Sequence, residues 1–106
     1  FCCVHDVIEG LMSLMETPKA CGMVYNIGSK EEISINALAE LIIRKTQSQS
    51  VKEYLSLEEA YGKPFDDMRK RVPCLQRIQQ TTDYMPKYTL EQTLELVIND
   101  IRSRLA

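Results

Sequence analysis

The sequence is poor in the residues that usually build catalytic and cofactor sites. It has one histidine, no tryptophan and four glycines, at positions 10, 22, 28 and 62. Glycines spaced in this way form no Gly-x-x-Gly-x-x-Gly turn, which excludes the usual backbone site for a dinucleotide pyrophosphate. None of the five tyrosines is followed by Lys four residues later, so no Tyr-x-x-x-Lys pair is present for proton exchange with a hydroxyl group. The sequence therefore predicts no catalytic residues of its own.

Charge, apolar runs and cysteine spacing exclude further classes. The net charge of -2 argues against nucleic acid and anionic membrane as partners. No apolar run approaches the ~20 residues of a membrane span. The four cysteines, at 2, 3, 21 and 74, contain no Cys-x-x-Cys pair, and His5 has no metal-site spacing to them. We expect buried, reduced cysteines, no metal and a cytoplasmic protein.

Hydrophobic patterning predicts an α/β fold with short strands and three to four helices. The strands are expected at 1–4, 23–27 and, less clearly, 51–55. The run 23–27 is nearly continuously apolar, as in a strand that is buried on both faces of a parallel sheet. Strands that alternate with helices indicate α/β layering.

Helix starts are marked by capping residues. Asp6 with Glu9 predicts a capping box for a helix that ends before Pro18. Three other caps are Ser34, Ser56 with Glu59, and Thr89 with Gln92. Helices are expected after the first and the last, a single helical turn after the second, and a short helix from Pro73 with Leu75 and Ile78 facing inward.

Five short motifs, in order along the chain, resemble the extended short-chain dehydrogenases. The first, from Phe1, is Phe-x-x-Val-x-Asp. Asn-x-Gly follows at 26–28, Glu-Ile-Ser-Ile with Leu-Ala at 32–39, Arg-x-Pro at 71–73 and Tyr-Met-Pro at 84–86. Cys74 stands where the family commonly has Asp, Asp83 where it has Gly, and Tyr84 where it has Trp.

The resemblance implies the C-terminal, substrate-binding part of an NAD-dependent nucleotide-sugar epimerase/dehydratase. It is most similar to UDP-sugar 4-epimerases and UDP-glucuronate decarboxylases, and the segment 58–71 favours a UDP-sugar 4-epimerase. Residues 1–106 would form a single domain fragment, the small lobe of a Rossmann-type enzyme. NAD and its N-terminal binding domain would belong to the full-length parent. The start at Phe1, without Met, also predicts a segment of a longer chain.

Within that resemblance, Arg71 aligns with the arginine that binds the substrate diphosphate, and Arg69 could share the role. A guanidinium suits a diphosphate because its planar fork donates two charge-assisted hydrogen bonds. The partners implied are a UDP-sugar and the missing NAD-binding domain. Asp66 and Asp67 could contact ribose hydroxyls, but we expect them to form a salt bridge to Arg69 or Lys70 instead. Two alternatives stay open: a non-catalytic nucleotide-binding module, or a protein-interaction module that uses the amphipathic helix 90–105.

Overall fold

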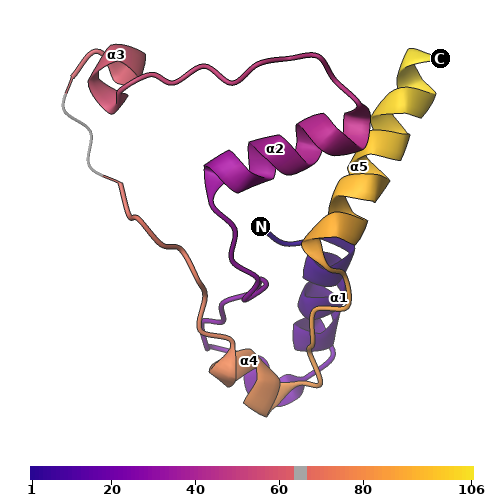
Figure 1. Ribbon diagram of the computed structural model, residues 1–106. Helices are drawn as coiled ribbons and strands as arrows, with labels where there is room; N and C mark the ends of the chain where they lie inside the picture. Colours follow the sequence, from indigo (N-terminus) through magenta and orange to yellow (C-terminus); the bar gives the residue numbers. More distant parts are fainter. Residues whose placement is uncertain (64–66) are drawn as a thin grey trace. The chain divides into compact units, whose positions relative to one another are not determined.

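The computed structural model describes residues 1–63 and 67–106, which divide into two compact units (Figure 1). Unit 1 combines Phe1–Glu32 with Val72–Ala106, and unit 2 is Ile33–Arg71. Unit 1 contains α1 (Val4–Met15), η1 (Pro18–Ala20), α4 (Gln76–Thr81) and α5 (Leu90–Leu105). Unit 2 contains α2 (Ile35–Thr46) and α3 (Leu57–Tyr61).

The predicted α/β fold with short strands is wrong, because every regular element in the described residues is helical. The segment 23–27 is extended but pairs with no strand, and side chains instead bond one carbonyl within it and the carbonyl of the next residue, Gly28. Arg77 Nη1 donates to the Val24 carbonyl at 2.8 Å, and the Tyr84 hydroxyl donates to the Gly28 carbonyl at 2.9 Å. The burial expected of an apolar strand is absent too, since Met23 and Val24 are 54% and 77% exposed. Strand pairing also requires a second strand, and the described residues contain none.

The helix α1 begins earlier than its sequence signal predicts. Its N-cap is Cys3, without a side-chain cap, so the predicted capping box of Asp6 and Glu9 is wrong. Asp6 lies in the first turn, only 1% exposed. Its carboxylate accepts the backbone N–H groups of Lys87 and Tyr88, at 2.9 and 3.1 Å. A buried carboxylate is stable when charged donors or several N–H groups satisfy it, and here it joins α1 to the segment before α5.

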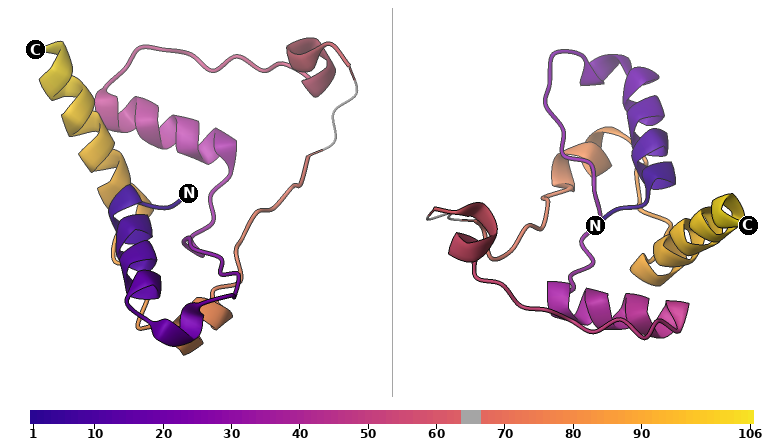
Figure 2. Two further views of the ribbon diagram at one scale, coloured as in Figure 1. Left: turned by 180° about the vertical axis from the view of Figure 1, so that it is seen from behind. Right: turned by 90° about the horizontal axis from the view of Figure 1, so that it is seen from above.

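Two views of unit 1 agree on this junction: in both panels of Figure 2 the start of α5 lies beside the first turn of α1. A second link reaches the first residue of α5 itself. Glu31 Oε2 accepts from the Leu90 N–H at 2.7 Å. That N–H has no partner within its helix, so the carboxylate satisfies it. The negative charge of the carboxylate also interacts favourably with the positive end of the helix dipole.

The core of unit 1 is small and centres on α4. Leu75 and Ile78 are 1% and 0% exposed, which confirms the prediction that both face inward. Tyr84 completes the cluster, and Leu14, Tyr25 and Ile27 pack against it from α1 and the extended segment. Complete burial of each large apolar side chain contributes about 1.5–3 kcal/mol. So few buried residues make the polar links around the core important for unit 1.

Three of the predicted caps are confirmed. Ser34 accepts from the Ala37 N–H at the start of α2. Full capping boxes begin α3, at Ser56 and Glu59, and α5, at Thr89 and Gln92. In each box, the hydroxyl and the longer side chain satisfy each other's backbone N–H groups.

In unit 2, the segment 51–55 is held to α2 by side chains and not by strand pairing. Lys52 Nζ and the Tyr54 hydroxyl both donate to Asn36 Oδ1, at 2.6 and 2.7 Å. Lys52 also pairs with Glu40, and this hydrogen bond lowers the pKa of Glu40 and raises that of Lys52. Val51 is 89% exposed, so this segment buries no apolar face that would favour a sheet.

Asp6→Asn should lower the free energy of unfolding by roughly 2–4 kcal/mol, because an amide cannot replace a carboxylate that accepts two backbone N–H groups. Urea unfolding followed by circular dichroism measures the change. Asp100→Asn is the matched control, since Asp100 forms an exposed pair with Arg104. Such a pair contributes ~0–1 kcal/mol. Equal effects of both substitutions would contradict the role given to Asp6.

Candidate functional site

The two arginines predicted to bind substrate lie in the described loop residues that follow α3. Both are exposed. The Arg71 guanidinium pairs with the carboxylate of Asp67, four residues earlier in the sequence. This hydrogen bond holds the Asp67 pKa below its usual value. Asp67 does form a salt bridge, but its partner is Arg71, so the predicted pairing with Arg69 or Lys70 is wrong. Asp66 lies outside the described residues.

The Arg71–Asp67 pair leaves the guanidinium accessible. The Arg71 side chain is 65% exposed, and a pair that open to solvent is worth ~0–1 kcal/mol. A ligand with two phosphates could therefore displace Asp67 at small cost. In exchange it would offer the guanidinium several charged acceptor oxygens.

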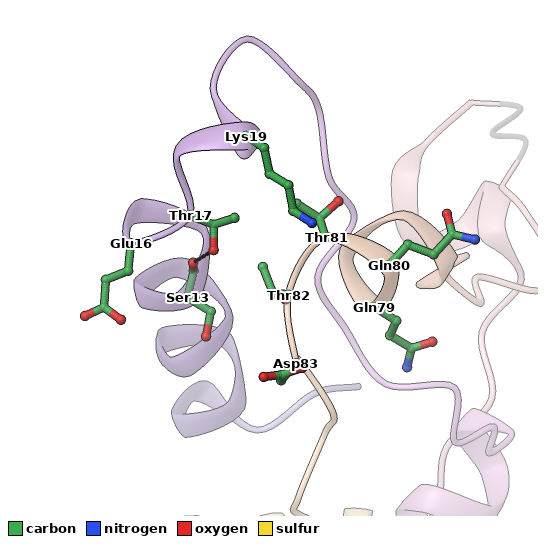
Figure 3. A pocket seen from close by; sticks show the side chains of 9 residues that line it. All are labelled: Ser13, Glu16, Thr17, Lys19, Gln79, Gln80, Thr81, Thr82 and Asp83. Atoms are coloured by element: carbon green, nitrogen blue, oxygen red, sulfur yellow. Dashed lines mark hydrogen bonds between the residues drawn. The ribbon is translucent and has the colours of Figure 1, made fainter.

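The pocket in unit 1 is a different place with different chemistry. It is open, has a volume of about 470 Å³, and lies between the end of α1 and α4 (Figure 3). Neither Arg69 nor Arg71 lines it. Its lining is polar throughout: Ser13, Glu16, Thr17, Lys19, Gln79, Gln80, Thr81, Thr82 and Asp83. Two carboxylates and one amine give the lining no excess of positive charge, so the pocket does not suit a diphosphate.

A buried polar cluster joins both ends of unit 1 around Tyr84. The Tyr84 hydroxyl donates to the Gly28 carbonyl, and Cys2 Sγ lies 3.9 Å from the Tyr84 hydroxyl oxygen. Burial, then the charges of Cys2 and Asp6, raise the pKa of Tyr84 to about 12. Burial also raises the pKa of the Cys2 thiol. The phenol and the thiol therefore stay protonated at neutral pH and serve as structural groups, without an acid–base function.

Sequence reasoning missed this function of Tyr84. It treated the residue as a smaller replacement for Trp, whereas the hydroxyl is what reaches Gly28. A Cβ added to Gly10 would lie 3.0 Å from the Tyr84 ring, so glycine at this position lets the ring approach α1. The available signal was an aromatic residue with a polar end, which seeks a partner when buried.

The motifs that carry the family resemblance meet one another in unit 1. Gly28, from the Asn-x-Gly motif, packs on Pro73 of the Arg-x-Pro motif, where an added Cβ would lie 2.9 Å from Pro73 Cγ. Asn26 Nδ2 donates to the Cys74 carbonyl at 3.4 Å. Asp6 and Tyr84 link the first and last motifs, as described above. Four of the five motifs therefore supply packing and hydrogen bonds to one joint.

Sites for other ligands are scarce in the described part of the chain. The N-caps of its α-helices are Cys3, Ser34, Ser56, Leu75 and Thr89, so none of these helices starts at a glycine-rich turn that fits a dinucleotide pyrophosphate. Across residues 1–63 and 67–106, no cluster of His, Cys, Asp and Glu has the arrangement of a metal site. Among the same residues, no helix has the length and apolarity that crossing a membrane requires.

The four cysteines are free thiols, in line with the sequence prediction of reduced cysteine. The prediction that they are buried holds for Cys3 but is wrong for Cys21 and Cys74, which are exposed. His5 packs against Tyr88, with the ring centroids 5.8 Å apart.

Comparison with curated proteins finds relatives whose names describe enzymes that act on UDP-sugars. UDP-glucuronic acid decarboxylase 6 of Arabidopsis thaliana is 34% identical over 99% of this chain and 28% of its own length. UDP-D-apiose/UDP-D-xylose synthase 2 of the same plant is 30% identical over 90% of the chain and 27% of its own length. UDP-N-acetyl-alpha-D-glucosaminuronate decarboxylase of Bacillus cytotoxicus is 29% identical over 96% of the chain and 32% of its own length.

The chain thus spans about 28% of the first of these relatives, and the match falls in their C-terminal region. No protein-family model matches the chain. No solved structure matches it either.

Tyr84 should ionise near pH 12 in the folded chain, well above the ~10 of an unfolded tyrosine. The folded state then holds this proton more tightly. The contribution of Tyr84 to the free energy of unfolding is therefore complete below pH 10 and is lost as the pH rises towards 12. A tyrosinate absorbance titration should show a late phase that is missing in Tyr84→Phe. A late phase that survives the substitution would contradict the assignment.

Proposed function

We propose that this chain, which belongs to the family of the UDP-glucuronic acid decarboxylases and UDP-D-apiose/UDP-D-xylose synthases, is the substrate-side part of an enzyme that acts on a UDP-sugar. Three of the relatives described above carry UDP-sugar names, and the match covers nearly the whole chain. The resemblance adds NAD as the cofactor of the longer enzyme, held by a domain that precedes these residues. The residues of this chain form part of the binding site for the nucleotide.

The observation that carries the proposal is the exposed Arg71 guanidinium. It stands at the Arg-x-Pro motif, two residues before Pro73, which packs on Gly28. Its present partner is a single exposed carboxylate, that of Asp67. A diphosphate offers stronger acceptors than this one carboxylate, and a planar guanidinium can meet two of them at once. Arg69, exposed in the same loop, is a second candidate for the same ligand.

The proposed reaction is decarboxylation of a UDP-uronic acid, with UDP-sugar 4-epimerisation as the alternative. Two of the relatives are named as decarboxylases, which favours the first. Incubation of the longer protein with UDP-glucuronic acid and, separately, UDP-glucose separates the two reactions. Loss of CO₂ from the first substrate supports decarboxylation, whereas inversion at the sugar C4 of the second supports epimerisation. If neither product forms, the proposal that the longer protein is an enzyme of this class is contradicted.

Arg71→Ala in the longer protein should weaken binding of UDP roughly 10- to 100-fold, because charge-assisted hydrogen bonds contribute ~1.5–3 kcal/mol. Arg71→Lys should recover only part of the loss, since an ammonium lacks the two-pronged geometry. Arg104→Ala is the matched control: Arg104 also forms an exposed pair with an aspartate four residues earlier. Calorimetric affinities for UDP that are equal in Arg71→Ala and Arg104→Ala would overturn the role of Arg71.

A further inference from the structure

The helix α1 exposes a continuous apolar face, here named the α1 stripe. Its members are Val4, Ile8, Leu11, Met12 and Met15, which are 62%, 48%, 50%, 54% and 86% exposed. Their spacing places them along one side of a helix, because residues three, four, seven and eight apart share a face. The other side of α1 faces the core through Asp6, Gly10 and Leu14.

The stripe is not explained by the packing within unit 1. Single exposed apolar residues are normal, but an apolar row on one helix face marks a surface that is covered in the working protein. The stripe contains no charged residue, which is typical of permanent interfaces and unlike the polar rim of transient ones.

We propose that the α1 stripe is the surface on which the preceding part of a longer polypeptide packs, an inference that rests on the proposed function. In UDP-glucuronic acid decarboxylase 6, nearly three quarters of the protein lies outside the matched stretch, and the match is C-terminal. Polypeptide that precedes residue 1 would join the chain three residues before α1 begins at Val4. Covalent attachment so close gives that body a high effective concentration at the stripe.

Methionine oxidation in the longer protein tests whether the stripe is covered. Met12 and Met23 are both 54% exposed here, so they form a matched pair on and off the stripe. Rates with hydrogen peroxide, read by mass spectrometry, are referred to the same protein in urea. Met12 and Met15 should be protected roughly ten-fold or more, because burial withholds the thioether from oxidant, and Met23 much less. Equal protection of Met12 and Met23, or none, would overturn the proposal.

Photo-crosslinking identifies what covers the stripe. Met15 is replaced by benzoylphenylalanine in a mixture of ¹⁴N- and ¹⁵N-labelled protein, with the same replacement at Met85, 63% exposed, as the control. A crosslink from position 15 to a peptide that precedes residue 1, within one isotopic species, supports the proposal. A crosslink to residues 33–71, a crosslink between isotopic species, or no crosslink overturns it.

The two proposals fail in distinguishable ways. A longer protein that converts a UDP-sugar but leaves Met12 and Met15 unprotected refutes the docking surface alone. Protection of both methionines in a protein that neither binds UDP nor converts a UDP-sugar refutes the proposed function alone. A natural polypeptide with no domain-sized stretch before residue 1 would overturn the docking proposal directly.

Discussion

The buried Asp6 carboxylate is the constraint on which unit 1 depends. Unit 1 is built from two pieces of chain, separated by the whole of unit 2, and Asp6 joins them by accepting two backbone N–H groups. Burying a charge without such partners is costly, so the position of α1 and the path of 87–88 are fixed together. The core around Leu75 and Ile78 is too small to hold the two pieces in register by apolar packing alone.

Most of the motifs that carry the family resemblance, together with Gly10, therefore act mainly on structure. Gly10 and Gly28 allow close approach of the Tyr84 ring and Pro73, and the Tyr84 hydroxyl satisfies a carbonyl that would otherwise need a neighbouring strand. Arg71 differs from these: it is exposed, weakly paired and chemically suited to phosphate. Under the proposed function, this short motif therefore has two functions: Pro73 packs on Gly28, and Arg71 is the proposed contact for the ligand.

Local signals predicted local structure well. Ser34, Ser56 and Thr89 mark helix starts because each cap depends on residues within one turn. The same logic failed at Asp6, whose partners lie more than eighty residues away, at 87 and 88. It also failed for 23–27, since a short apolar run cannot say whether a second strand is present to pair with it. The two arginines were found only through family resemblance, because exposed loop charges have no periodicity to reveal them.

The central claim is that Arg71, and not the polar pocket of unit 1, meets the nucleotide. The most direct measurement is the ¹H–¹⁵N spectrum of arginine side chains in the longer protein, with and without UDP. The account predicts that the Arg71 Nε–Hε signal, assigned through Arg71→Lys, moves on addition of UDP, while that of Arg104 does not. An unmoved Arg71 signal, with backbone shifts at Thr17 and Thr82 in the pocket, would contradict it.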